Sequence, residues 1–228
     1  TAARLDVPLI VDTGIGDKFD EKFAQIYAVQ KEASLLDNLR AKGIAPEDLT
    51  HVIMTHMHFD HIGWNTRKAE NGELVPTFPN AIYFAQKGEF ETAKNPDPRS
   101  RASYLVENWA PLEKSGQLEL LDGAGDVLPG IESIITGGQT EFHSIIKLST
   151  DKGTVVFLAD LVPTPSHLKT PYIMGYDLFP KQTMETKPKV LKQAFQEKWL
   201  LVFEHSARVT GGYLQEDSGN FGLKEVRF

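Results

Sequence analysis

The most informative segment of the chain reads Thr55-His56-Met57-His58-Phe59-Asp60-His61-Ile62-Gly63-Trp64, directly after the apolar, β-prone run Val52-Ile53-Met54. Imidazole nitrogens and carboxylate oxygens are the ligands that zinc and similar divalent ions prefer. In an extended segment, residues two apart point to the same side, so we expect His56 and His58 to face one ion. Asp60 and His61 follow where the chain turns and are expected to face a second point nearby. The alternative is a polar loop whose histidines are fortuitous.

Further candidate ligands stand at the ends of apolar strands and turns elsewhere in the chain. Asp160 follows the run Val155-Val156-Phe157-Leu158-Ala159, and His205 follows Leu200-Leu201-Val202-Phe203-Glu204. His143 closes the turn-rich stretch Gly137-Gly138-Gln139-Thr140-Glu141-Phe142. Polar residues in such places are fixed by a sheet and left open by the loops around them. They are therefore candidates for the additional ligands that a two-metal centre needs.

With these residues in place, the chain resembles the metallo-β-lactamase-fold hydrolase superfamily from Val11-Asp12-Thr13-Gly14 through His205. Within it, the chain looks most like the branch of acyl-homoserine lactonases and methyl-parathion-type organophosphate hydrolases. The H-x-H-x-D-H pattern is a highly specific feature of this superfamily. The resemblance implies an α/β (α+β) fold, a four-layer αββα sandwich, with residues 1–228 forming a single hydrolase domain.

The resemblance also implies a ligand set for two divalent ions. His56, His58 and His143 would bind the first ion, whereas Asp60, His61 and His205 would bind the second. Asp160 would bridge both ions, and Asp12 would support the ligands without binding metal. Zinc is the expected metal, although the same ligands accept iron, manganese or cobalt.

The sequence departs from the family pattern in two places. Many relatives read Gly-His-Thr-Pro-Gly-His where this chain has Gly138-Gln139-Thr140-Glu141-Phe142-His143, so the final histidine is kept within an altered loop. The family usually has strands before Asp-Thr-Gly, whereas eleven residues precede Asp12 here. We therefore expect a sandwich without its N-terminal strands, from a chain that has been trimmed or processed.

The predicted chemistry is hydrolysis by water activated between two metals. Two divalent ions about 3.5–4 Å apart lower the pKa of a shared water toward about 7, which gives a hydroxide near neutral pH. We expect this hydroxide to sit opposite Asp160 and to attack an ester or lactone carbonyl. Asp60 is a second catalytic candidate, which would take up a proton as the intermediate breaks down.

Four further residues are candidates for contact with the substrate. His167 and Tyr176 lie on the irregular segment 161–186, where relatives line the pocket. A surface histidine and a packed loop tyrosine are equally compatible with these positions. Phe59 and Trp64 flank the expected metal ligands and are candidates for an apolar pocket wall or for the core.

Composition narrows the function further. The 228 residues carry a net charge of −7, which argues against nucleic-acid binding and favours a small uncharged substrate. The chain has no cysteine, so thiolate ligands and disulfides are excluded. No apolar run is long enough to span a bilayer, and no signal-peptide pattern opens the sequence. We expect a cytoplasmic homodimer, with a processed secreted form as the alternative location.

Four functions are compatible with these features. The first is a lactonase or esterase, and the second is a phosphotriesterase that uses the same activated water on phosphorus. The third is a thioesterase of the glyoxalase II kind, which lacks support because no Lys/Arg-bearing glutathione region is evident. The fourth is a mono-iron oxygenase or a metal-bound protein without catalysis. The complete set of seven ligands argues against a degenerate binding protein.

The patterns also predict individual elements. We expect strands at residues 8–11, 81–84, 118–121, 131–135 and 144–148, with the last forming a hairpin with 154–158. Helices are predicted at residues 34–41, 104–114 and from Pro188 onward, with Ser34 as an N-cap and Pro188 in a first turn. Residues 212–228 are expected to form a hairpin that turns at Gly219-Asn220.

Overall fold

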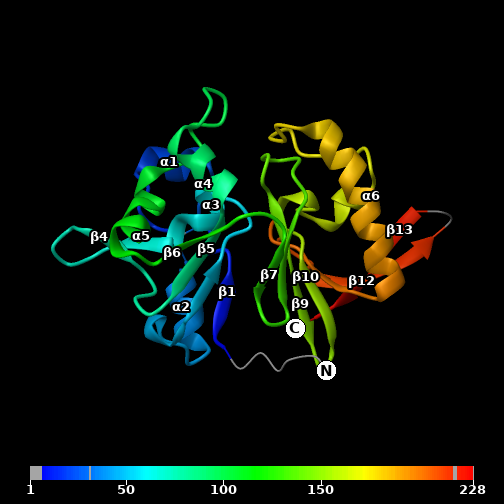
Figure 1. Ribbon diagram of the computed structural model, residues 1–228, viewed down its shortest axis with the longest axis horizontal. Coiled ribbons are helices and arrows are strands. Elements are labelled where there is room, and N and C mark those ends of the chain that lie inside the picture. The colour runs from blue at the N-terminus through cyan, green and yellow to red at the C-terminus, as the bar shows by residue number, and fades with distance from the viewer. Residues whose placement is uncertain (1–6, 31, 218–219, 228) are drawn as a thin grey trace. The chain divides into compact units, whose positions relative to one another are not determined.

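The computed structural model describes residues 7–30, 32–217 and 220–227. The chain divides into two compact units, an N-terminal unit, Val7–Asp122, and a C-terminal unit, Gly123–Phe228. Each unit is built on its own sheet, as the ribbon in Figure 1 shows. Mixed α/β content was predicted and is confirmed in both units.

The N-terminal unit contains a four-stranded sheet of order β1-β2-β5-β6. All three strand pairs are parallel, which places the carboxyl ends of the strands at one edge. The strands are β1 (Leu9–Val11), β2 (His51–Ile53), β5 (Ile82–Gln86) and β6 (Leu118–Leu121). A separate antiparallel pair is formed by β3 (Thr66–Lys68) and β4 (Leu74–Pro76).

Short helices connect and cover these strands. They are α1 (Glu21–Ile26), α2 (Leu35–Ala41), α3 (Phe59–Ile62), α4 (Lys87–Lys94) and α5 (Ala110–Ser115), with 3-10 turns η1 (Pro46–Asp48), η2 (Gly63–Asn65) and η3 (Val106–Asn108). Ser34 caps α2 as predicted, because its hydroxyl accepts the Asp37 N–H while the Asp37 carboxylate accepts the Ser34 N–H. The core between helices and sheet includes Val52, Met57, Phe78, Tyr83 and Leu112, all fully buried.

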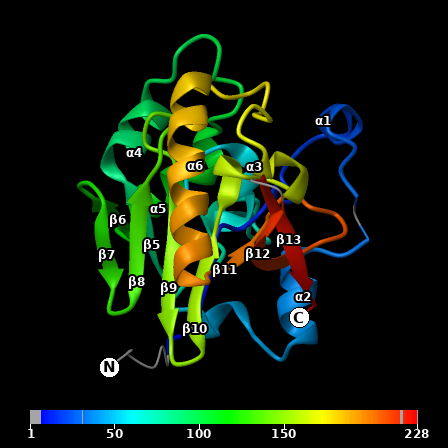
Figure 2. The same cartoon turned by 90° about the vertical axis from the view of Figure 1, so that its right-hand side faces the viewer.

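The C-terminal unit contains a seven-stranded sheet of order β13-β12-β11-β10-β9-β8-β7. Its strands are β7 (Gly125–Leu128), β8 (Ile131–Ile135), β9 (Ser144–Thr150), β10 (Gly153–Phe157), β11 (Leu200–Val202), β12 (Gly211–Asp217) and β13 (Asn220–Val226). Among the described strands of this sheet, only β10 and β11 pair in parallel. Helix α6 (Pro180–Glu197) lies in the connection between these two strands. Figure 2 shows α6 running along this sheet. Two 3-10 turns, η4 (Ala159–Leu161) and η5 (Pro165–Leu168), follow β10.

Two of the predicted helices differ from the structure. Residues 104–114 do not form one helix but η3 and α5, separated at Trp109 with φ −132° and ψ −28°. Pro111 has no N–H to donate to the Glu107 carbonyl, which instead accepts the Thr66 hydroxyl at 2.7 Å. Helix α6 begins at Pro180, so Pro188 lies inside it and not in its first turn. The irregular segment after Asp160 is correspondingly shorter than predicted.

The other predicted elements agree with the structure. The hairpin of β12 and β13 is confirmed, whereas the expected turn residue Gly219 lies outside the described residues. The expectation of a single domain stays a prediction. Among the described residues, no helix combines the length and apolar character needed to cross a bilayer. The cytoplasmic location stays a prediction as well.

Candidate metal centre

Three buried histidines of the N-terminal unit follow β2: His56 and His58 precede α3, and His61 lies within it. His58 precedes α3 in an extended conformation, φ −68° and ψ 152°, so the chain turns between His58 and Asp60 as predicted. The centroid of the His56 ring lies 4.6 Å from the centroid of the His58 ring and 4.0 Å from that of the His61 ring. The Nε2 atom of His61 lies 3.7 Å from the Asp60 carboxylate. The structure therefore brings the four residues of the motif together within one unit.

Asp12 holds this segment from the end of β1. Its carboxylate accepts the Thr55 N–H at 2.8 Å and the Thr55 hydroxyl at 2.6 Å. It also pairs with Nδ1 of His61 at 2.9 Å, so Nε2 is the nitrogen of that ring presented for an ion. Asp12 has φ 52°, a strained value for a residue with a side chain, and this conformation aims the carboxylate at both groups. Its contacts support the predicted role beside the ligands.

The C-terminal unit groups the other three candidate ligands. The Thr136 hydroxyl bonds Nδ1 of His143 at 2.7 Å, while Nε2 of His143 accepts the Asp160 N–H at 3.1 Å. Nε2 of His205 lies 2.9 Å from Oδ1 of Asp160. Ala159, just before Asp160, has φ 44°, so the backbone is strained here as it is at Asp12. The sheet thus places His143, Asp160 and His205 next to one another.

The donor atoms in each unit fit a divalent ion such as zinc. Hydroxyl or carboxylate groups bond Nδ1 of His56, His61 and His143, which orients each ring and makes Nε2 its ligand nitrogen. Two ligands on one ion, each at about 2.0–2.2 Å, lie roughly 3 Å apart, as the His205 and Asp160 atoms do. Binding through Nε2 of His143 would replace its bond from the Asp160 N–H.

Two further titratable residues of the C-terminal unit, His167 and Lys187, lie on η5 and α6. His167 lies on η5, where its Nδ1 bonds the Thr164 hydroxyl at 2.8 Å. Burial lowers the pKa of His167, and the nearby Lys187 ammonium lowers it further. The Lys187 side chain is fully buried in α6, and Nζ donates to the Tyr172 carbonyl at 2.5 Å. Burial lowers the pKa of Lys187, and the nearby Asp177 carboxylate opposes this shift.

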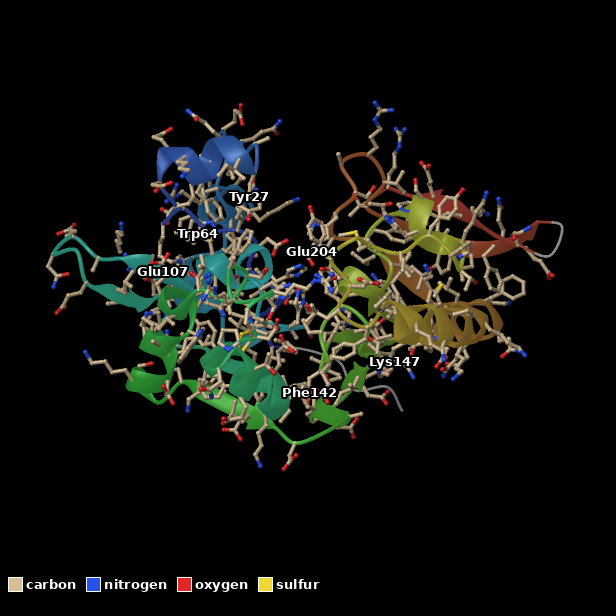
Figure 3. All side chains as sticks on the ribbon, turned by 90° about the horizontal axis from the view of Figure 1, so that it is seen from above. Tyr27, Trp64, Glu107, Phe142, Lys147 and Glu204 are labelled. Atoms are coloured by element: carbon tan, nitrogen blue, oxygen red, sulfur yellow. The ribbon has the colours of Figure 1, made fainter. Side chains whose placement is uncertain are left out.

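The substrate candidates Phe59, Trp64 and Tyr176 lie in different surroundings. Phe59 lines a cavity of about 520 Å³ in the N-terminal unit, and its ring stacks edge-on against Phe23 and Tyr27 at 5.0 and 4.9 Å. Trp64 lines a different cavity of about 570 Å³ beside Asp12. Figure 3 labels Tyr27 and Trp64. Tyr176 is 73% exposed, and its role as a substrate contact stays a prediction.

Several residues that form hydrogen bonds to or beside the candidate ligands were not predicted from the sequence. Thr55 and Thr136 orient candidate ligands, and buried Glu89 accepts the N–H of Met57 at 3.2 Å. Thr55 stands directly beside His56, which is a signal that could have identified it. Glu89 is 32 residues from Met57 in the sequence, and Thr136 lies seven residues before His143, but no local pattern marks either residue.

Residues 6–205 match the family model described as the metallo-beta-lactamase superfamily. The chain belongs to this superfamily. The predicted family is therefore confirmed, as is the predicted class of enzyme, a metal-dependent hydrolase with lactonase relatives.

Individual relatives agree with this placement. An N-acyl homoserine lactonase of Bacillus cereus is 29% identical over 161 residues, which cover 66% of this chain and 57% of the relative. A probable metal-dependent hydrolase of Staphylococcus aureus is 28% identical with a TM-score of 0.85, covering 98% of this chain and 80% of that one. AidC, a dizinc quorum-quenching lactonase solved with a product, shares the fold at 20% identity and a TM-score of 0.77, covering 99% and 78% of the two chains.

Proposed function

We propose that the protein is a lactonase that opens the ring of N-acyl homoserine lactones or similar acylated lactones. The observation that carries this proposal is the aromatic cavity at Phe59. Phe19, Phe23, Tyr27 and Phe59 line it, and Phe59 stands between the candidate ligands His58 and Asp60 in sequence. An apolar acyl chain seated there would bring the attached ring to the metal ligands. The lactonase relatives support the same substrate class.

The proposed ligand set follows the family motif. We assign His56, His58 and His143 to one ion, Asp60, His61 and His205 to a second, and Asp160 to both. When bound, the ions supply an activated water and charge stabilisation for the carbonyl oxygen. Asp12 holds His61 in its ligand orientation through the 2.9 Å bond to Nδ1.

Opening of the lactone ring requires a proton on the ring oxygen that leaves the carbonyl carbon. Water adds to the lactone carbonyl and the ring C–O bond breaks, so a carboxylate and a hydroxyl are formed. We assign this proton transfer to the Asp60 carboxylate, whose side chain is 35% exposed: it takes up a proton of the attacking water as the intermediate breaks down and passes it to the leaving oxygen. The net reaction acidifies the solution near neutral pH, which makes turnover directly measurable.

The first experiment combines elemental analysis of protein purified without chelator with pH-stat assays. Hexanoyl and decanoyl homoserine lactones, a phosphotriester and a thioester form the substrate panel. We expect about two metal ions per chain and turnover of the lactones. His58→Ala and Asp160→Ala are expected to lose metal and activity together. Metal-loaded protein that cleaves the phosphotriester but no lactone would contradict the proposal.

We also infer that the protein forms a homodimer. β1 lies at the edge of the four-stranded sheet, and no described strand pairs with its outer side. An exposed strand edge favours pairing with another chain. Light scattering at micromolar concentration is expected to give twice the monomer mass of 25.4 kDa, and a monomeric mass would remove this inference.

A further inference from the structure

In the histidine segment, the backbone N–H groups of every second residue from Thr55 to Phe59 donate hydrogen bonds to acceptors that do not belong to a β-strand. The Thr55 N–H donates to Oδ1 of Asp12 at 2.8 Å, the Met57 N–H to Oε1 of Glu89 at 3.2 Å, and the Phe59 N–H to the Ser103 carbonyl at 2.8 Å. β2 has already ended at Ile53. The extended shape of the ligand segment is therefore set by two buried carboxylates and one loop carbonyl, not by a neighbouring strand.

Glu89 is the less expected of these acceptors. It lies in the first turn of α4 and is 1% exposed. Its Oε1 atom also accepts the Tyr104 hydroxyl at 2.8 Å, and the Tyr104 ring lies edge-on to the His58 ring at 4.9 Å. Burying a carboxylate costs several kcal/mol unless donors offset it. The Met57 N–H and the Tyr104 hydroxyl are two such donors, and they tie the carboxylate to the histidine segment.

The hydrogen bond to Glu89 fixes the backbone at Met57, which lies between the candidate ligands His56 and His58. The Met57 side chain is fully buried in the apolar core, so the imidazoles of His56 and His58 project from the other side of the extended segment. We propose that Glu89, together with Tyr104, is a positioning residue of the metal centre. Glu89 fixes the Met57 peptide, and Tyr104 packs against the His58 ring, so that both imidazoles are held for one ion. This inference rests on the proposed metal binding by His56 and His58.

Removing such a support lowers metal affinity by about 10- to 100-fold while the ligands themselves stay in place. We expect a loss of this size for Glu89→Ala. Tyr104→Phe removes one bond to Glu89 but keeps the ring against His58, so a smaller loss is expected. Glu89→Gln keeps an oxygen that can accept the Met57 N–H and is expected to restore most of the affinity.

The test measures metal binding, not activity. Zinc is titrated into the chelator-treated protein in competition with a chromophoric chelator. The absorption spectrum of the cobalt-loaded protein reports ligand geometry. Melting curves of the metal-free variants separate a lost fold from lost positioning. Glu91→Ala is the matched control, because Glu91 is an exposed glutamate two residues further along α4. It is expected to bind zinc as the unmodified protein does.

The inference is overturned if folded Glu89→Ala binds zinc with unchanged affinity and gives an unchanged cobalt spectrum. If Glu89→Ala does not fold, Tyr104→Phe decides, and unchanged affinity and spectrum in that variant also overturn it. An unmodified protein that binds no zinc would remove both the inference and the proposed function. Protein that binds zinc but opens no lactone would remove only the proposed function.

Discussion

Phe59 connects the histidine motif with the aromatic cavity, because its ring contacts those of Phe23 and Tyr27. Burying a phenyl side chain contributes about 1.5–3 kcal/mol. We expect Phe59→Ala to lower kcat/KM for decanoyl homoserine lactone by about 10- to 100-fold, with a smaller decrease for a butanoyl lactone and unchanged metal content. Steady-state kinetics on both substrates checks this.

Phe195→Ala serves as the control for Phe59→Ala, since Phe195 is an exposed aromatic residue of α6 in the other unit. Its kinetics are expected to match those of the unmodified protein. An equal decrease for short and long acyl chains in Phe59→Ala would contradict a role for Phe59 in holding the acyl chain.

Lys18 lies beside the same motif, where Nζ donates to the carbonyl oxygens of Gly63 and Thr66. Burial lowers its pKa from 10.5 to about 8, with Glu107 opposing the shift. The folded state therefore releases this proton at a lower pH than the unfolded state does. As the pH rises from about 8 toward 10.5, this difference increases the free energy of unfolding.

Urea denaturation of the metal-free protein across this pH range measures the effect of Lys18. The stability of the unmodified protein relative to Lys18→Met is expected to rise through the window. Lys22→Met, which alters an exposed lysine, is expected to leave the pH dependence unchanged. A constant difference between the unmodified protein and Lys18→Met at every pH would count against this prediction.

At the scale of elements, backbone hydrogen bonds join the end of α3 to the turn after β1. The Gly63 N–H donates to the Gly14 carbonyl and the Thr13 N–H to the His61 carbonyl, both at 2.6 Å. A Cβ atom at Gly63 would overlap the carbonyl of Ile15. Gly63→Ala is therefore expected to destabilise the fold by about 1–3 kcal/mol and to weaken zinc binding, because His61 lies two residues away.

Chemical denaturation and zinc titration test Gly63→Ala. Gly175→Ala is the comparison, since a Cβ there meets no atom within 4 Å. It is expected to change neither property. Wild-type stability in Gly63→Ala would show that the close approach of the two backbones is not required.

The elements that could be predicted are those whose signal is local. Ser34 with Asp37 three residues later predicts a helix start, and the turn residues Lys152-Gly153 between two apolar runs predict the hairpin of β9 and β10. The motif likewise predicts a cluster of His56, His58 and His61, because its geometry depends on one short segment. Asp160 and His205 were predicted at the ends of apolar strands, and the structure shows that these strands, β10 and β11, are parallel neighbours.

The start of α6 could not be predicted because its first turns bury polar residues. Thr183 and Lys187 face inward, and their polar atoms bond Asp177 and the Tyr172 carbonyl. Apolar periodicity therefore begins only at Val190, which made Pro188 look like the first turn. Glu89 was missed for a similar reason, since its partners Met57 and Tyr104 are distant in sequence.

At the scale of the whole molecule, the proposed ligands are spread over residues 56–205, whereas each unit has an apolar core of its own. The cores contribute to stability whether metal is present or not. Metal binding adds to it by mass action, since an ion that binds only the folded chain at 100 times its Kd contributes about 2.7 kcal/mol.

We therefore expect chelation to lower the melting temperature by about 5–10 °C, since 1 kcal/mol corresponds to roughly 2–4 °C for a chain of this size. Thermal melts of the purified, the chelator-treated and the zinc-restored protein check this, with magnesium as a control ion that His-rich sites bind poorly. His58→Ala is expected to gain less stability from zinc than the unmodified protein does, because it lacks one of the proposed ligands. Equal melting temperatures for the metal-loaded and chelated unmodified protein would mean that the folded chain gains no stability from the ions, and the proposed ligand set would then have to be abandoned.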